Sequence, residues 1–351
     1  MKFKYIVKKA AVLFLAAALC VGNLTGCGKE TKVVFTMGLS GNQVFQIGSK
    51  TCVKPELMVY LITFYNQYAK TYGEEMWTHD FGGITLEDYV KKEVLSKMVQ
   101  IKIMNLMAQE RKISLNADEE KKVLEASRAY YQSLPESLKK QEKITQEIAE
   151  CVYEEYAVAN KVYATITESA DMEISDDEAR TVTVQAIYLK NWKMKNNEKE
   201  PMSESETLKV LEQARQLLKR LEEGEDFETL AVQYSDDKQI VKSFARGDVQ
   251  DNLEEILFSM DEGDLSHVIE TKDGYYILKC ISTMDDEATQ KNKIVLAQQR
   301  QRKAFSDAYK MIAENTHSQL RDKYWEKVTI DGAEYQSDAD FFKIYEEYVK
   351  Q

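Results

Sequence analysis

The stretch RLEEGEDFETLA, residues 220–231, decides how the middle of this chain folds. Apolar residues recur upstream of it at spacings of three and four, which predicts a helix over Ser203–Leu221. Gly224 is expected to end that helix, because glycine is common just after the last helical turn. Asp226 then caps a predicted short helix, Phe227–Tyr234.

The sequence on both sides of this stretch predicts further short elements. A strand is predicted over Thr181–Leu189, with Val182, Val184, Ala186 and Tyr188 on one face. A loop containing Arg246-Gly247-Asp248 precedes a helix predicted around Leu253–Met260. A strand pair follows, formed by 268–270 and 275–279, with Lys272-Asp273-Gly274 between them. Asp-Gly between two β-rich runs is a strong hairpin signal.

This order of elements resembles the parvulin type of peptidyl-prolyl isomerase domain, also known as PpiC or rotamase. Six pieces carry the resemblance in order: 224–231, Tyr234-Ser235, Gly247-Asp248, Phe258-Ser259, 262–266 and 274–279. It covers roughly residues 178–285, and we set the domain at 176–285. The resemblance implies an α/β domain with a small antiparallel sheet that rotates the peptide bond preceding proline, a reaction without a covalent intermediate.

The N-terminus has the features of a bacterial lipoprotein leader. Four lysines precede the apolar run Ala10–Val21, and Leu24-Thr25-Gly26-Cys27 looks like a lipobox. We therefore expect residues 1–26 to be a signal peptide and Cys27 to carry the lipid, which places the protein outside the cytoplasm on the cell membrane. An uncleaved N-terminal anchor is the alternative, although the apolar run is short for a spanning helix of about 20 residues.

Charge and cysteine content narrow the possible functions. The 351-residue chain has a formal net charge of −12, which becomes −16 without the leader and its four lysines. An acidic chain without a basic tract argues against nucleic acid as a partner. Cys52, Cys151 and Cys280 are far apart and make neither a disulfide framework nor a metal cluster. We expect no cofactor and no metal.

The N-terminal region is predicted to be mostly helical after a short hairpin. The hairpin would pair Val33–Phe35 with Gln43–Ile47. The predicted helices begin at Pro55, at Leu86, after the capping box Asn116–Glu119, and at Ile144, the last one ending at Ile166. Their aromatic and methionine residues would line a client-binding groove or simply form the helical core: Tyr60, Phe64, Tyr65, Tyr68, Met98, Met104 and Met107.

The C-terminal region and one insert complete the predicted elements. Asn196–Ser205 is expected to be a solvated loop. A long helix should run from after Met284 to near Trp325, followed by a strand at Val328–Ile330 and a helix at Phe341–Tyr348.

Helices on both sides of a parvulin-like unit resemble PrsA-like and SurA-like extracytoplasmic foldases. The implied fold class is α+β, with a mostly helical chaperone domain built from both ends of the chain around an inserted isomerase domain. The implied divisions are a leader (1–26), an N-terminal helical region (27–175), the parvulin-like domain (176–285) and a C-terminal helical region (286–351). The implied partners are unfolded or newly secreted polypeptides.

The resemblance also implies where the isomerase site lies and how it departs from the family. Two histidines face each other in parvulins, and their positions here hold Ala186 and Tyr276. The Cys or Asp of the family corresponds to Asp237. Asp237 and Tyr276 are therefore the candidate catalytic residues. The candidate substrate-binding residues are Val249, Leu253, Phe258 and Thr271.

Three functions remain open from the sequence. The chain is a lipid-anchored folding factor with weak isomerase activity, a chaperone whose parvulin-like unit has lost catalysis, or an unrelated surface lipoprotein. The first two hypotheses differ in whether catalysis survives without both family histidines. The question arises because a tyrosine hydroxyl does not replace an imidazole in proton exchange.

Overall fold

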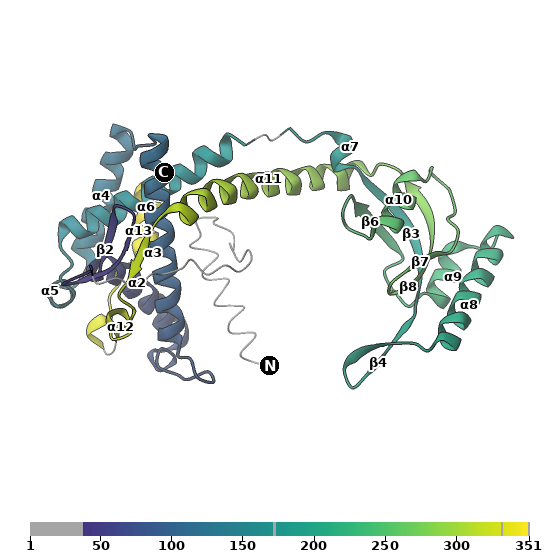
Figure 1. The fold of residues 1–351 in the computed structure, drawn as a ribbon, viewed down its shortest axis with the longest axis horizontal. Coiled ribbons are helices and arrows are strands. Elements are labelled where there is room, and N and C mark those ends of the chain that lie inside the picture. The colour runs from purple at the N-terminus through teal and green to yellow at the C-terminus, as the bar shows by residue number, and fades with distance from the viewer. Residues whose placement is uncertain (1–37, 171–172, 331–332, 350–351) are drawn as a thin grey trace. The chain divides into compact units, whose positions relative to one another are not determined.

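The computed structural model describes residues 38–170, 173–330 and 333–349. The chain divides into two compact units, drawn in Figure 1: unit 1 comprises residues 1–170 and 301–351, and unit 2 comprises residues 171–300. The predicted leader, the lipidation residue Cys27 and the predicted strand Val33–Phe35 lie outside the described residues.

Unit 1 is mainly helical. Its helices are α2 (Lys54–Tyr72), α3 (Leu86–Arg111), α4 (Ala117–Ser133), α5 (Glu136–Glu142), α6 (Gln146–Glu168), α12 (Asp322–Trp325), α13 (Phe341–Val349) and the second half of α11 (Asp286–Asn315). The capping box predicted at Asn116 is confirmed, because Asn116 Oδ1 accepts from the amides of Asp118 and Glu119 while its own amide donates to Glu119. None of the helices within the described ranges is long and apolar enough to span a membrane.

A three-stranded antiparallel sheet in unit 1 joins distant parts of the chain. Its order is β2 (Lys50–Val53), β1 (Gln43–Ile47), β9 (Ser318–Leu320), and Phe45 of β1 pairs with Leu320 of β9. The predicted C-terminal elements were wrong here. Helix α11 ends at Asn315 rather than near Trp325, because the following residues leave the helix to pair with β1, and Val328–Ile330 forms no strand.

The core of unit 1 is aromatic and is centred on Phe341. The ring of Phe341 lies 4.3 Å from that of Tyr153 and 4.8 Å from that of Tyr60. The residues considered for a client-binding groove are at most 4 % exposed: Tyr60, Phe64, Tyr65, Tyr68, Met98, Met104 and Met107. They form the helical core, so the groove interpretation of these residues was wrong.

Three charged side chains are buried together inside unit 1. The Lys102 Nζ lies 2.5 Å from Glu56 Oε2 and 2.7 Å from Glu155 Oε2. Burial raises the pKa of Glu155, and Lys102 opposes this shift. The two carboxylates in turn raise the pKa of Lys102 against the effect of its burial. This triad ties α2, α3 and α6 together.

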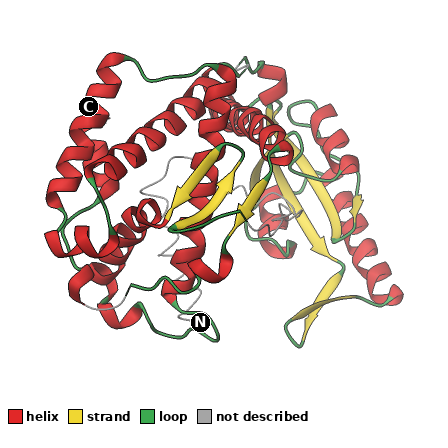
Figure 2. Ribbon diagram, turned by 60° about the vertical axis from the view of Figure 1, so that its left-hand side comes forward, coloured by secondary structure: helices red, strands yellow, loops and turns green. Residues whose placement is uncertain are grey.

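Unit 2 is built around a four-stranded antiparallel sheet. Its strands are drawn in yellow, together with those of the other sheets, in Figure 2. The strand order is β6 (Val241–Ala245), β3 (Thr181–Lys190), β8 (Gly274–Ser282), β7 (Ile269–Thr271). Helix α10 (Asp251–Ser259) packs on the face that carries Val182, Val184 and Ala186. Helices α8 (Glu204–Glu222) and α9 (Phe227–Tyr234) pack on the opposite face, over Ile187 and Leu189. A short helix, α7 (Asp176–Ala179), precedes β3.

The predicted loop after β3 was wrong, because this segment forms a β-hairpin. Strand β4 (Trp192–Lys195) pairs with β5 (Glu198–Pro201) and Lys195 pairs with Glu198. The two turn residues, Asn196 and Asn197, have φ values of 52° and 65°. Positive φ at both central positions is the requirement of a type I′ hairpin, and asparagine tolerates it better than most residues. The α+β fold class with small antiparallel sheets is confirmed.

Candidate functional site

The two positions predicted to replace the family histidines, Ala186 and Tyr276, lie on neighbouring central strands. Ala186 of β3 pairs with Leu278 of β8. Two residues further along the same two strands, Tyr188 pairs with Tyr276. Ala186 and Tyr276 therefore face the same side of the sheet, diagonally across one strand pair. The methyl group of Ala186 is buried, so this position offers only apolar surface.

Tyr276 lies against a second tyrosine. Its ring stacks on that of Tyr188, with 4.7 Å between the centroids and 30° between the planes. The Tyr188 hydroxyl donates to the carbonyl of Asp273 at 2.6 Å and accepts from the Trp192 indole at 3.2 Å. Tyr188 is thus held by the hairpin turn on one side and by β4 on the other, and it supports the ring of Tyr276.

The ionisation of Tyr276 follows from this setting. Burial, the neighbouring Tyr188 and the carboxylates of Asp237 and Asp273 together raise the pKa of Tyr276 to about 12. The hydroxyl therefore keeps its proton at neutral pH. It can donate a hydrogen bond to a substrate carbonyl, but it does not exchange protons near pH 7 as an imidazole would.

Asp237 lies in a loop that is fastened to β3. The Ser235 hydroxyl accepts from the amides of Tyr188 and Asp237, and the Asp236 amide donates to the Tyr188 carbonyl at 2.8 Å. The Asp237 carboxylate forms a close ion pair with Lys242 of β6 and accepts from the Gln239 amide at 2.9 Å. The Lys242 ammonium, more than any other group, lowers the pKa of Asp237.

The predicted apolar floor is brought together around α10. Leu253 is buried in the cluster that contains Ala186, and Val249, Phe258 and Tyr276 pack against that cluster. Thr271 lies at the end of β7, where its hydroxyl donates to the Gly274 carbonyl at 2.8 Å and closes the hairpin before Tyr276. Three of the four predicted substrate-binding residues thus share one apolar cluster with Tyr276, whereas Thr271 secures the adjacent turn.

Two residues of this site were missed by the sequence analysis. Tyr188 could have been identified from the sequence, because side chains alternate along a strand and this places Tyr188 on the same face as Ala186. Lys242 had none, because β6 itself was not predicted: its sequence, VKSFA, was read as part of a loop. Lys242 pairs in register with Val184, and this pairing directs its side chain toward the site face.

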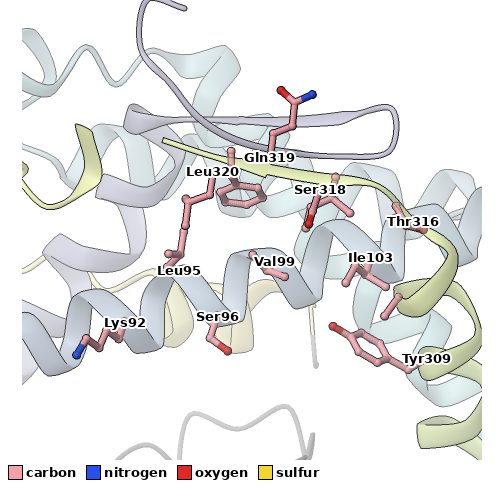
Figure 3. Close-up of a pocket in the computed structure, with 13 residues that line it drawn as sticks. Lys92, Leu95, Ser96, Val99, Ile103, Tyr309, Thr316, Ser318, Gln319 and Leu320 are labelled. Carbon is pink, nitrogen blue, oxygen red and sulfur yellow. The ribbon is translucent and has the colours of Figure 1, made fainter. Parts of the chain in front are cut away.

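Unit 1 contains a separate apolar pocket of about 390 Å³. Figure 3 shows Leu95, Val99 and Ile103 on α3 facing Ser318 and Leu320 on β9, with Tyr309 of α11 at one end. The lining is mostly aliphatic and aromatic, with Lys92 as its cation. Such a pocket is suited to apolar side chains.

The described residues include no cluster arranged to bind a metal ion and no exposed, activated thiol. No group of three or more His, Cys, Asp or Glu side chains within 38–170, 173–330 and 333–349 is arranged to hold a metal ion. Cys52, Cys151 and Cys280 are free, and burial raises the pKa of each thiol. Buried thiols with raised pKa values are poor nucleophiles.

Comparison with known families identifies the site-bearing segment. Residues 193–282 match the family described as Rotamase, the PPIC-type PPIASE domain. This segment is a parvulin-type rotamase domain. The matched region contains Asp237 and Tyr276 of the rotamase domain but begins after β3, which carries Ala186 and Tyr188.

Individual relatives extend the similarity beyond the rotamase domain. The chain is 24 % identical over 282 residues to the Foldase protein PrsA of Caldanaerobacter subterraneus subsp. tengcongensis, covering 78 % of this chain and 82 % of the relative. It is 32 % identical over 118 residues to Foldase protein PrsA 3 of Bacillus cereus, covering 30 % of this chain and 42 % of that protein. The crystal structure of a PrsA peptidylprolyl isomerase from Bacillus cereus matches with a TM-score of 0.34 and 20 % identity, over 77 % of this chain and 97 % of that structure. The predicted parvulin-type, PrsA-like resemblance is confirmed.

Proposed function

We propose that this chain is an extracytoplasmic protein-folding factor that accelerates prolyl isomerisation weakly in secreted polypeptides. The observation that carries the proposal is the clustering of Ala186, Leu253, Phe258 and Tyr276 on one face of a rotamase domain. Such a reaction requires at least an apolar surface that binds the proline ring and one hydroxyl donor beside it.

The proposed chemistry needs only binding and hydrogen bonding. Rotation about a peptide bond has a barrier of about 18–20 kcal/mol, which falls when the amide is held twisted. The apolar cluster would hold the proline ring, and the protonated Tyr276 hydroxyl would bind the carbonyl that turns. Asp237 would act through its ion pair with Lys242, which fixes the ammonium at the edge of the site. Without an imidazole pair, the acceleration should be small.

A protease-free isomerisation assay tests this proposal. The full-length chain is added to a proline tetrapeptide prepared in the cis form, and the slow cis-to-trans phase is followed with and without the Tyr276→Phe variant. Acceleration that the variant reduces supports the proposed site. No acceleration at any protein concentration would remove the catalytic part of the proposal.

We propose further that the chain is anchored to the membrane by a lipid on Cys27, after removal of residues 1–26. The lipobox-like sequence Leu24–Cys27 supports this. Palmitate labelling in a bacterial host is expected to mark the chain. Cys27→Ala should abolish the label, whereas Cys20→Ala, which changes a cysteine inside the leader, should retain it.

The proposed organisation inserts an isomerase domain, 176–285, into a chaperone domain made of 27–175 and 286–351. The pairing of β1 with β9 supports it, because residues from both ends of the chain share that sheet. Limited proteolysis is the test: cleavage should concentrate in the loops at residues 173–175 and 283–285 and leave a fragment carrying the rotamase domain.

The second candidate function is a chaperone that binds unfolded chains without catalysis. The apolar pocket lined by Leu95, Val99 and Leu320 favours it. Suppression of aggregation of an unfolded client is the readout. Val99→Gln should weaken the suppression, and Val232→Gln, at a position 62 % exposed on α9, serves as the matched control.

A further inference from the structure

We propose that Arg180 and Arg246 form a carboxylate-binding subsite beside Phe258, so that the rotamase domain prefers polypeptide segments with an acidic side chain about two residues from the proline. The choice of proline-containing segments rests on the proposed function. The subsite itself rests on the positions and partners of the two arginines.

The last residue pair between β3 and β6 lies next to both arginines. Thr181 of β3 pairs with Ala245 of β6, and Arg180 and Arg246 flank this pair immediately outside the two strands. Like charges that face each other across a strand pair are destabilising. A pair of cations in this arrangement calls for an anion between or beside them.

Both guanidinium groups are directed to the same ring of the apolar floor. The Arg246 Cζ lies 4.4 Å from the centroid of Phe258, and the Arg180 Cζ lies 5.1 Å from it. Arg180 also donates to the Phe258 carbonyl at 3.0 Å. Phe258 thus fixes both cations at the edge of the surface proposed to hold the substrate.

The protein provides little counter-charge for this pair. Within the described residues, Arg180 has no carboxylate partner, and its Nε is buried without a hydrogen-bond acceptor. Arg246 approaches Asp177 only to 3.9 Å, and the Asp177 side chain is 82 % exposed. A guanidinium group without a carboxylate partner has an uncompensated charge, and a carboxylate bound to the outer nitrogens of these two side chains would neutralise it.

The neighbouring acids of α7 are already engaged with other cations. Asp176 lies 2.5 Å from Lys293, and Glu178 lies 2.6 Å from Arg300. The arginine pair therefore keeps its positive charge available, although the chain as a whole is acidic.

Phe258 relates the subsite to the proline position. Its ring packs against the apolar cluster proposed to hold the proline ring, and both guanidinium groups lie within 5.1 Å of its centroid. Two residues of an extended substrate span about 7 Å. An acidic side chain about two residues from the proline would therefore reach the arginines.

The test uses amidated and acetylated peptides with one central proline. One peptide carries Asp two residues before the proline and another carries Asp two residues after it, and each has a twin with Asn in place of Asp. Calorimetric binding to the full-length chain is expected to favour one Asp peptide over its twin by about fivefold, the size of an exposed charge pair. Arg246→Gln should remove this preference. Arg215→Gln, which removes the same charge from exposed α8, should retain it.

The outcomes separate the subsite from the catalytic proposal. Equal binding of Asp and Asn peptides in both orientations, or equal losses in the two arginine variants, would overturn the subsite. Isomerisation of the same peptides is measured independently by NMR exchange. An Arg246-dependent Asp preference without faster exchange would keep the subsite and remove the isomerase activity. Faster exchange without that preference would do the reverse.

Discussion

Tyr276 lies face to face with Tyr188 across the two central strands of the unit 2 sheet, with ring centroids 4.7 Å apart. The Tyr188 hydroxyl is committed to the Asp273 carbonyl and to Trp192, so this ring serves as the fixed support of the other. The position at which the family resemblance predicts a histidine is thus filled by a tyrosine whose ring is held in place and whose hydroxyl can donate a hydrogen bond.

Tyr276→Phe should lower the prolyl isomerisation rate about threefold to tenfold, equivalent to about 0.7–1.4 kcal/mol of barrier. The ring and its stacking remain, and only the donor is lost. Because the pKa of Tyr276 is about 12, the parent rate should stay level from pH 6 to pH 9. A rate that rises through pH 6–7 would instead indicate an imidazole in the reaction.

Lys242→Gln should raise the pKa of Asp237 toward the ordinary carboxyl value of about 3.9. The ion pair with Lys242 is the main cause of the lowered pKa, so removing the ammonium removes most of the shift and leaves the smaller contribution of the Gln239 amide. Carbon-13 NMR titration of the Asp237 carboxyl measures this directly.

The same variant makes a prediction for stability. A carboxyl with a lowered folded-state pKa stabilises above its unfolded pKa, and this contribution is lost as the pH falls through the folded value. The penalty of Lys242→Gln should therefore be present at pH 7, below about 1 kcal/mol for a partly exposed pair, and vanish in acid. A penalty that persists at pH 2 would mean that Lys242 acts through packing.

Gly274→Ala should destabilise the rotamase domain by about 2–4 kcal/mol. A Cβ at this position would lie 2.2 Å from the Leu189 carbonyl oxygen, and the φ of 148° is one that L-residues rarely adopt. The matched control is Gly247→Ala, where φ is 86° and nothing lies within 4 Å of the added Cβ, so about 1–2 kcal/mol of backbone strain is expected. Equal urea midpoints for the two variants would contradict the steric argument.

Lys102→Met should destabilise unit 1 by about 3–5 kcal/mol, because it leaves two buried carboxylates without their cation. Burial already raises the pKa of Glu155, and a raised carboxyl pKa makes the folded state less stable as the pH rises. The penalty should therefore be larger at pH 8 than at pH 5 in urea unfolding. Replacing Glu56 and Glu155 with Gln in the same variant should recover part of the loss. A penalty independent of pH would exclude this explanation.

The sequence predicted the elements whose own residues determine them. The helix at Phe227–Tyr234 has a capping aspartate and an apolar face, and the cap at Asn116 is a local hydrogen-bond pattern. The fold class and the parvulin resemblance could be predicted from the order of such locally determined elements along the chain.

The errors arose where pairing with a distant segment decides the structure. Strand β9, with sequence SQL, is a strand only because Phe45 pairs with Leu320. Strand β6 is half-exposed and lies at the sheet edge, so its five residues show no apolar alternation. The β4–β5 hairpin was hidden by its polar composition, although Asn196-Asn197 was a usable turn signal. Lys242 was missed for the same reason as β6.

The pairing of β1 with β9 also sets the order in which the chain can be completed. Residues 43–47 are made early, but their partner at 318–320 and the central Phe341 are made last. At 5–20 residues per second, synthesis from residue 170 to 349 takes about 10–40 s. Throughout that interval the first helices lack the side chain around which they pack, whereas the contiguous unit 2 has all its strands as soon as residue 282 is made. Although this protein is similar to foldases, the apolar core of its own helical unit stays exposed during synthesis. The helical unit is therefore the last part of the chain to complete its folding.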